Sequence, residues 1–152
     1  MRVADLMNRR SAAIIPSTTM QRAAELLVLT QASDLCVVNQ DNQFLGIVSE
    51  GDLIRAAMPD FDEVVAYGAS NEQTLEILLD TGRSIAGESV ERLIIKSALT
   101  LAPDDSLMRA AAVMLNKMIR RLPVVEDGRL VGTLSRADLV WGMMCLNHNR
   151  RG

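Results

Sequence analysis

Residues 46–53 read Gly-Ile-Val-Ser-Glu-Gly-Asp-Leu, and residues 132–139 repeat the pattern as Gly-Thr-Leu-Ser-Arg-Ala-Asp-Leu. In each stretch a glycine and two apolar residues lead to a serine, and an aspartate and a leucine follow. A short β-rich run precedes both, Leu-Cys-Val-Val at 35–38 and Leu-Pro-Val-Val at 122–125. Because an internal repeat marks a duplicated structural unit, the sequence predicts two copies of one fold element.

The repeat extends outward from these stretches over most of the chain. A shift of 87 residues aligns Pro16 with Pro103, and the shift becomes 86 after the turn at 126–128, which is one residue shorter than its counterpart. Hairpin loops tolerate such a change well. We expect a first copy at 1–58, a structured insert at 59–88, a second copy at 89–146 and a polar tail at 147–152.

Each copy is predicted to contain a strand, a helix, a two-stranded hairpin and a second helix. In the first copy, Ser17 or Thr18 can cap a helix whose apolar residues follow the i, i+3, i+4, i+7 spacing. Asp127-Gly128 is a strong hairpin turn in the second copy. The closing helices are expected to begin near Asp52 and Asp138. The fold class is therefore mixed α/β (α+β).

The insert has helix signals of its own. Ser70 and Gln73 form a capping box ahead of an apolar run, and Gly82 is a typical helix stop. These signals predict a helix from about 71 to 81.

Composition restricts the classes of function. The net charge of −3 provides no general attraction to DNA, RNA or anionic lipid. Cys36 and Cys145 are isolated, which argues against zinc and against a disulfide framework. The chain shows no signal peptide and no apolar run of ~20 residues, so we expect a cytoplasmic protein without a membrane span. His148 lies in a polar stretch, and no catalytic or metal-binding set is recognisable, so we do not expect an enzyme.

The duplicated Ser-x-x-Asp pattern has two interpretations. It can be a helix capping motif, with the serine accepting a backbone N–H and the acid favouring the positive end of the helix. It can also lie at a ligand site, because a helix start after a strand favours anions. The same motif at matched positions in both copies favours a site.

These features together resemble the CBS-domain family, in the form of a tandem pair called a Bateman module. The resemblance rests on the two Gly-h-h-Ser-x-x-Asp-Leu stretches (h, apolar), the segment 121–125, the segment 3–7, and the prolines Pro16 and Pro103. It implies two βαββα motifs related by a pseudo-twofold axis, packed through their sheets. It also implies clefts that bind adenosine-containing ligands such as AMP, ADP, ATP or another adenosyl compound, with no obligatory cofactor.

The resemblance further implies roles for individual residues in these clefts. Asp52 and Asp138 would accept hydrogen bonds from ribose hydroxyls, while Ser49 and Ser135 would face phosphate. Adenine would lie against a set of mostly apolar residues, namely Ile14, Thr100, Leu101, Pro123 and Val124.

The two copies differ in charge beside this motif. Arg120 and Arg121 precede the second β-rich run, whereas Ser33 and Asp34 precede the first. The resemblance implies that a basic residue here reaches phosphate, and guanidinium–phosphate pairs are strong. A solvated helix end is the alternative role for the arginines. We expect one good phosphate site, in the second copy, and a first cleft that is weak, empty or suited to a neutral nucleoside.

The sequence therefore favours a regulatory ligand-sensing module that binds an adenine nucleotide or related metabolite and signals to a partner protein. A homodimer is expected, because the helices are rich in methionine and other apolar residues. The alternative is a structural dimerisation module with degenerate, empty clefts. Binding of nucleic acid ranks third, since aromatic residues are few.

Overall fold

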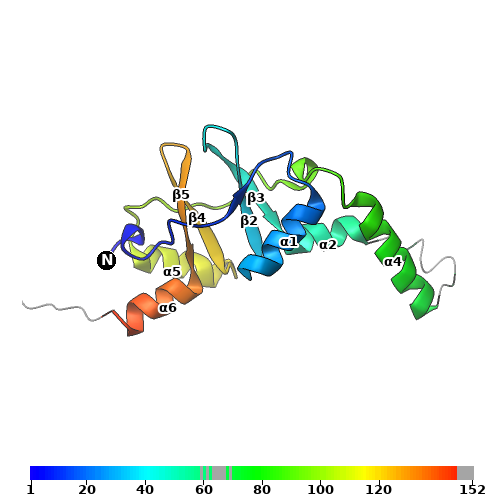
Figure 1. The fold of residues 1–152 in the computed structure, drawn as a ribbon. Helices are drawn as coiled ribbons and strands as arrows, with labels where there is room; N and C mark the ends of the chain where they lie inside the picture. The colour runs from blue at the N-terminus through cyan, green and yellow to red at the C-terminus, as the bar shows by residue number, and fades with distance from the viewer. Residues whose placement is uncertain (59, 61, 63–67, 69, 147–152) are drawn as a thin grey trace, which may run out of the picture. The chain divides into compact units, whose positions relative to one another are not determined.

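The computed structural model describes residues 1–58, 60, 62, 68 and 70–146. This part of the chain forms two small sheets and five α-helices, which confirms the mixed α/β class (Figure 1). In chain order the elements are η1 (Val3–Asp5), β1 (Ala13–Ile14), α1 (Met20–Thr30), β2 (Asp34–Val38), β3 (Phe44–Ser49), α2 (Glu50–Ala57), α4 (Asn71–Ile85), η2 (Glu91–Leu93), α5 (Leu107–Asn116), β4 (Arg121–Glu126), β5 (Arg129–Ser135) and α6 (Arg136–Met144).

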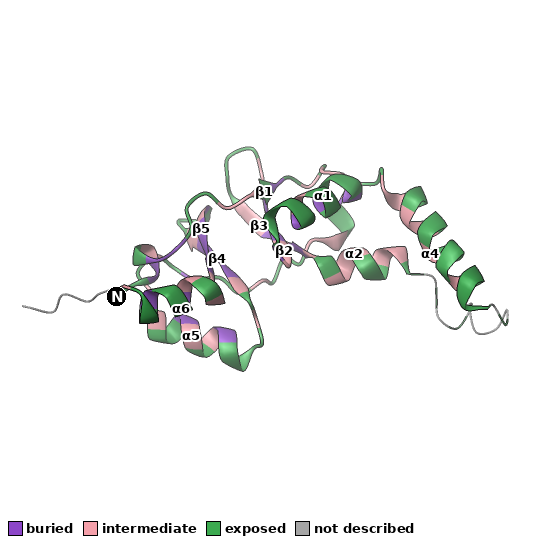
Figure 2. Cartoon of the chain, turned by 60° about the horizontal axis from the view of Figure 1, so that its bottom comes forward, coloured by how far each residue is buried: buried purple, intermediate pink, exposed green. Residues whose placement is uncertain are grey.

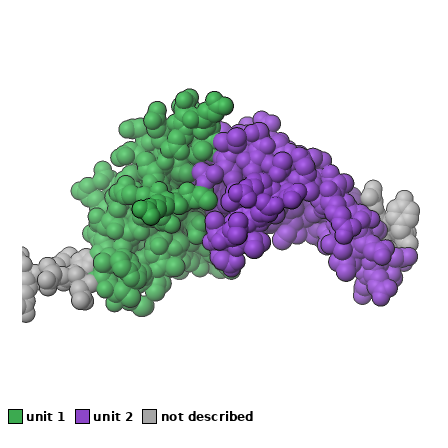
Figure 3. Space-filling view, viewed as in Figure 1, with its two compact units in different colours: residues 1–12, 38–44, 97–152 green, residues 13–37, 45–96 purple. Residues whose placement is uncertain are grey.

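Two compact units divide the chain, and each combines segments of both sequence copies (Figure 3). Unit 1 holds the described residues of 1–12, 38–44 and 97–152, and unit 2 holds those of 13–37 and 45–96. The first segment of each copy thus packs in the same unit as the helices of the other copy. The bounds of the sequence copies themselves stay a prediction.

Matched hydrogen bonds show how these first segments are held. In unit 1 the N–H of Val3 donates to the carbonyl of Asp105 at 2.9 Å. In unit 2 the N–H of Val90 donates to the carbonyl of Thr18, also at 2.9 Å. Val3 and Val90 are equivalent in the repeat, and both are fully buried. The duplication therefore extends to individual backbone contacts.

The glycine of the repeated motif lies where the first segment of one copy crosses a strand of the other copy. Asn8 exchanges two backbone hydrogen bonds with Thr133, at 2.8 and 3.0 Å, and Ile95 does the same with Ile47. A Cβ on Gly132 would lie 2.8 Å from the carbonyl oxygen of Asn8. A side chain at this position would collide with backbone, so the close crossing requires glycine.

In unit 2, α1 begins one residue later than the sequence suggested. Thr19, and neither Ser17 nor Thr18, is the N-cap, because its hydroxyl oxygen accepts from the N–H of Arg22. The hydroxyl of Thr18 instead accepts from the N–H of Ile15 and closes the preceding turn. The inner face of α1 packs on the sheet of β1, β2 and β3, where its buried residues are Met20, Ala23 and Leu27.

In unit 1 the hairpin of β4 and β5 forms as predicted. Asp127 and Gly128 have φ of 50° and 77° and connect strands that pair in antiparallel register. Left-handed conformations at both turn positions match the right-handed twist of the strands. Behind the hairpin, α5 and α6 cover a core whose largest fully buried side chains are Met114, Leu122, Leu134, Val3 and Val124.

The helix predicted in the insert is present and longer than expected. Ser70 and Gln73 form the capping box, and α4 then runs through Gly82 to Ile85. Gly82 as a helix stop was therefore wrong. The helix continues beside α2, where a Cβ on Gly82 would lie 3.9 Å from the Cβ of Ala57. None of its residues is buried (Figure 2).

Candidate ligand-binding site

The motif of the second copy lies at the junction of β5 and α6. Ser135 is the N-cap of α6, and its hydroxyl oxygen accepts from the N–H of Asp138 at 3.1 Å. The N–H and the hydroxyl of Ser135 both donate to Oδ2 of Asp138, each at 2.7 Å. Both residues are half-buried. The capping role considered from the sequence is thus fulfilled, while Oδ1 of Asp138 has no hydrogen-bond partner among the described residues.

The motif of the first copy is arranged differently. The hydroxyl oxygen of Ser49 accepts from the N–H of Asp52, and the hydroxyl donates to Asp52 Oδ2 at 2.7 Å. Oδ1 of Asp52 accepts from the guanidinium of Arg55, one turn along α2, at 2.6 Å. Partial burial raises the pKa of Asp52, but the hydrogen bonds from Ser49 and Arg55 outweigh it and leave the pKa lowered. Asp52 is therefore a carboxylate whose two oxygens are both engaged.

Arg120 and Arg121 flank the second motif. Arg121 pairs with Ser135 across the β4–β5 ladder, and the carbonyl of Arg120 accepts from the N–H of Arg136 at 3.0 Å. Arg120 is exposed and Arg121 half-buried, and neither guanidinium forms an ion pair with a described residue. No described carboxylate therefore pairs with either of these two arginines.

The equivalent position in the first copy keeps the backbone geometry but not the charge. The carbonyl of Ser33 accepts from the N–H of Glu50 at 3.0 Å, which matches the bond between Arg120 and Arg136. Asp34 takes the place of Arg121, and the hydroxyl of Ser33 donates to its carboxylate at 3.4 Å. The charge difference predicted from the sequence thus falls on matched positions of one local structure.

Sequence reasoning missed the role of Arg136, the first residue of α6. Its guanidinium donates to the carbonyls of Met114 and Ile119, each at 2.8 Å. Met114 lies in the last turn of α5, whose final carbonyls lack partners within the helix, and Ile119 lies in the segment that follows α5. Arg136 thereby fixes the segment that leads to Arg120 and Arg121. The sequence did carry a signal for this role, because the position occupied by Glu50 in the first copy is occupied by Arg136 in the second.

The residues expected to contact adenine fall into two groups. Thr100 is exposed. Ile14, Leu101, Pro123 and Val124 are buried; Leu101 and Val124 meet in a parallel bridge of unit 1, and Ile14 lies in the core of unit 2. In unit 1 the backbone N–H of Leu101 donates to the carbonyl of Pro123 at 2.9 Å. An adenine contact for any of these residues stays a prediction.

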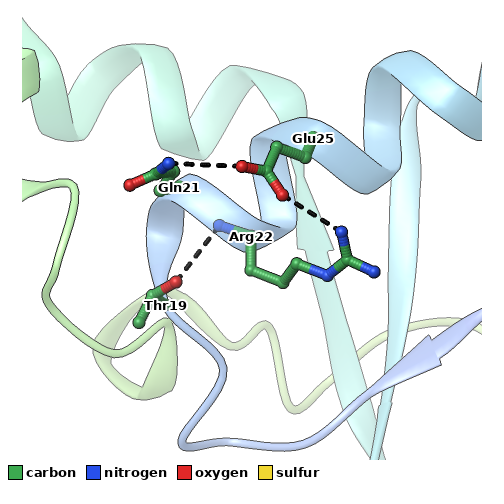
Figure 4. Close-up of polar contacts among 4 residues, drawn as sticks. All are labelled: Thr19, Gln21, Arg22 and Glu25. Atoms are coloured by element: carbon green, nitrogen blue, oxygen red, sulfur yellow. Dashed lines mark hydrogen bonds and ion pairs between the residues drawn. The ribbon is translucent and has the colours of Figure 1, made fainter.

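A groove of about 720 Å³ lies in unit 2 between α1, α2 and α4. Apolar side chains line most of it, and none of the predicted site residues does. Figure 4 shows the polar contacts of α1 beside it: Arg22 donates to Glu25 at 3.0 Å and Gln21 donates to Glu25 at 3.2 Å. These two hydrogen bonds hold the pKa of the exposed Glu25 below its usual value. The groove lacks the convergent polar groups of a nucleotide site.

Metal-ligand clusters and membrane-spanning helices are both absent from the described part of the chain. No group of three or more His, Cys, Asp or Glu side chains there is arranged to hold a metal ion. Among the same residues, no helix combines the length and the apolar character needed to cross a bilayer.

Comparison with known proteins matches both copies of the repeat to the same family. The model of the CBS domain matches residues 3–59 and 90–144. The chloroplastic CBS domain-containing protein CBSX1 of Arabidopsis thaliana is 30% identical over 135 residues, which cover 82% of this chain and 56% of that protein. A homoserine O-acetyltransferase of Methanohalophilus mahii is 31% identical over 143 residues, but the chain spans only 24% of it. The chain thus covers about half or less of these relatives.

Solved structures share the fold. The crystal structure of CBSX2 in complex with AMP is 30% identical, covers 93% of this chain and 95% of its own, and superposes with a TM-score of 0.70. The CBS domain pair of protein MJ0100, in complex with 5′-methylthioadenosine and S-adenosyl-L-methionine, is 18% identical and superposes with a TM-score of 0.63. At that lower identity the likeness concerns the fold alone.

Proposed function

This chain belongs to the CBS-domain family as a tandem pair, and we propose that its second copy binds an adenosine-containing ligand and passes the bound state to a partner protein. The observation that carries the proposal is the set of groups around Ser135. An oxygen of Asp138 is unbonded, and the backbones of Arg121 and Arg120 pair with Ser135 and bond to Arg136 at the start of α6; neither arginine has an ion-pair partner among the described residues.

The chemistry of these groups suits a nucleoside phosphate. A carboxylate accepts two hydrogen bonds from vicinal hydroxyls, and Asp138 has an oxygen available for them. Arg121 and Arg120 supply charge-assisted hydrogen bonds for phosphate. A nucleoside phosphate therefore suits the second copy better than the first. In the first copy Asp34 stands in place of the cation, and Arg55 binds the second carboxylate oxygen. That CBSX2 has been crystallised with AMP supports the same class of ligand.

We further propose that the module acts without catalysing a reaction and works as a homodimer. Large apolar side chains are exposed on the helices of both units: Val28, Leu29 and Ile54 in unit 2, and Met108, Met143 and Met144 in unit 1. Exposed apolar patches of this kind often mark protein–protein contacts. The same surfaces support the alternative function, a dimerisation module with empty clefts, so the ligand test must separate the two.

A thermal-shift panel separates them. AMP, ADP, ATP, adenosine and S-adenosyl-L-methionine are each titrated against the wild-type protein, Ser135→Ala and Ser106→Ala. Ser106 is the N-cap of α5, so its replacement is a matched loss of a cap without a predicted ligand role. Each alanine variant should lose about 1 kcal/mol of stability in the absence of ligand.

A ligand at 100 times its dissociation constant stabilises the folded state by about 2.7 kcal/mol. We expect AMP to raise the melting temperature of the wild type and of Ser106→Ala, and to raise that of Ser135→Ala much less. No shift in any protein with any compound would instead support the dimerisation module.

A further inference from the structure

The two copies differ at one more matched position, one turn beyond the aspartate. Arg55 follows Asp52 by three residues on α2, and the repeat places Trp141 at the same distance after Asp138 on α6. Residues three apart lie on the same face of a helix and can touch. In the first copy they do, because Arg55 donates to Asp52 Oδ1 at 2.6 Å.

We infer that Arg55 closes the ribose acceptor of the first copy and that Trp141 leaves the acceptor of the second copy open. The inference rests on the proposed function, since it assigns the difference between the clefts to these two side chains. The contrast between Arg121 and Asp34 concerns the phosphate of the ligand. The contrast between Trp141 and Arg55 is separate and concerns its vicinal hydroxyls.

The distribution of hydrogen bonds on the two carboxylates supports this assignment. Ser135 places both of its hydrogen bonds on Oδ2 of Asp138, so the other oxygen remains for a ligand. In Asp52 one oxygen accepts from Ser49 and the other from Arg55. A ligand hydroxyl would have to share Asp52 Oδ1 with the guanidinium of Arg55 or displace it, and a neutral donor forms a weaker bond to a carboxylate than a cationic one does.

The contact between Arg55 and Asp52 forms although the arginine side chain is largely exposed to solvent. The side chain of Arg55 is 69% exposed and that of Asp52 is 19% exposed. An exposed ion pair contributes little to stability. Replacing Arg55, or introducing an arginine at position 141, should therefore change the ligand preference more than the stability of the fold.

Trp141 carries no cation that could pair with the carboxylate of Asp138. Its indole N–H is a single neutral donor, and the residue is 53% exposed on α6. An arginine at this position would have the same spacing from Asp138 on α6 as Arg55 has from Asp52 on α2. The internal repeat thus provides a matched exchange within one protein.

The test compares AMP with 2′,3′-dideoxy-AMP, which carries the same phosphate and base but lacks both ribose hydroxyls. Because an arginine at position 141 would attract the two phosphates alike, the ratio of their dissociation constants isolates the hydroxyls. Calorimetric titration of the wild type, Trp141→Arg and Trp141→Met gives this ratio. The methionine variant is the control, because its side chain is flexible and unbranched like that of arginine but carries no charge.

We expect the wild type and Trp141→Met to prefer AMP by about tenfold, the size typical of hydrogen bonds to a charged group. Trp141→Arg should reduce the preference to less than threefold while still binding AMP. A tenfold preference that persists in Trp141→Arg would overturn the inference and leave the proposed function standing. A wild type that binds both compounds equally would do the same, whereas a wild type that binds neither would overturn both.

The first copy supplies a second arm that does not depend on the folding of Trp141→Arg. In an Asp138→Ala background, adenosine and 2′,3′-dideoxyadenosine are titrated with and without Arg55→Met. The neutral nucleosides avoid repulsion by Asp34. Adding Arg55→Met should create a preference for adenosine of at least about fivefold, and no change in preference would overturn the inference.

Discussion

Arg121 lies directly opposite Ser135 across the β4–β5 ladder. Ser135 is also the residue at which the strand ends and α6 begins. One position thus brings an arginine to the start of a helix, and a guanidinium and a helix N-terminus each favour an anion. In the first copy Asp34 stands at the position equivalent to Arg121, so a carboxylate takes the place of the cation there.

Arg121→Ala should weaken AMP binding by about tenfold and leave the affinity for adenosine unchanged. The loss corresponds to one charge-assisted hydrogen bond to phosphate, of about 1.5 kcal/mol. Calorimetric titration with both compounds measures it. Arg129→Ala is the control, because Arg129 is an exposed arginine of the same hairpin. Equal losses for AMP and adenosine in Arg121→Ala would show that Arg121 does not contact phosphate.

Two helix glycines should respond in opposite directions to alanine. Gly82 lies inside α4 with room for a Cβ, so Gly82→Ala should stabilise the protein by about 0.5–1 kcal/mol. In Gly142→Ala the new Cβ would collide with the buried side chain of Leu6, which should cost about 1–3 kcal/mol.

Urea unfolding of both variants measures the two effects. A destabilised Gly82→Ala would contradict the continuation of α4 through this residue. A neutral Gly142→Ala would contradict the close packing of α6 on the segment around Leu6.

Asp52 should contribute to stability at neutral pH and lose that contribution in acid. Burial opposes its charge, but hydrogen bonds from Ser49 and Arg55 lower its pKa below the ordinary value of 3.8. A carboxyl group whose pKa is lower in the folded state stabilises that state above its unfolded pKa. The stabilisation disappears as the pH falls through the folded pKa.

Asp52→Asn should therefore be less stable than the wild type at pH 7 and should approach it as the pH falls well below the ordinary pKa of 3.8. The exposure of Arg55 limits the difference to about 1 kcal/mol or less. Urea unfolding between about pH 2.5 and pH 7 tests this. A difference that does not change with pH would contradict the ionic hydrogen bonds of Asp52.

Local signals in the sequence predicted most of the elements. The capping box of Ser70 and Gln73 marked the start of α4, and Asp127-Gly128 marked the hairpin turn, because each signal acts within a few residues. The repeat predicted the matched serine and aspartate. The difference between Arg121 and Asp34 was also visible, since it needs only an alignment of the two copies.

Other features depend on partners that sequence spacing does not specify. The exchange of first segments, seen in the bonds of Val3 and Val90, is set by long-range packing. The predicted end of α4 was wrong because contact with α2 outweighs the local preference of Gly82 for ending a helix. The contact of Arg55 with Asp52 was missed because the same spacing allows a long side chain to point into solvent.

The most direct test of the central claim is the stoichiometry of AMP binding measured by isothermal titration calorimetry on the wild type, Asp138→Ala and Asp52→Ala. We predict one AMP per chain in the wild type and in Asp52→Ala, and at least about a tenfold loss of affinity in Asp138→Ala. AMP binding that survives in Asp138→Ala and disappears in Asp52→Ala would place the ligand in the first copy and contradict this account.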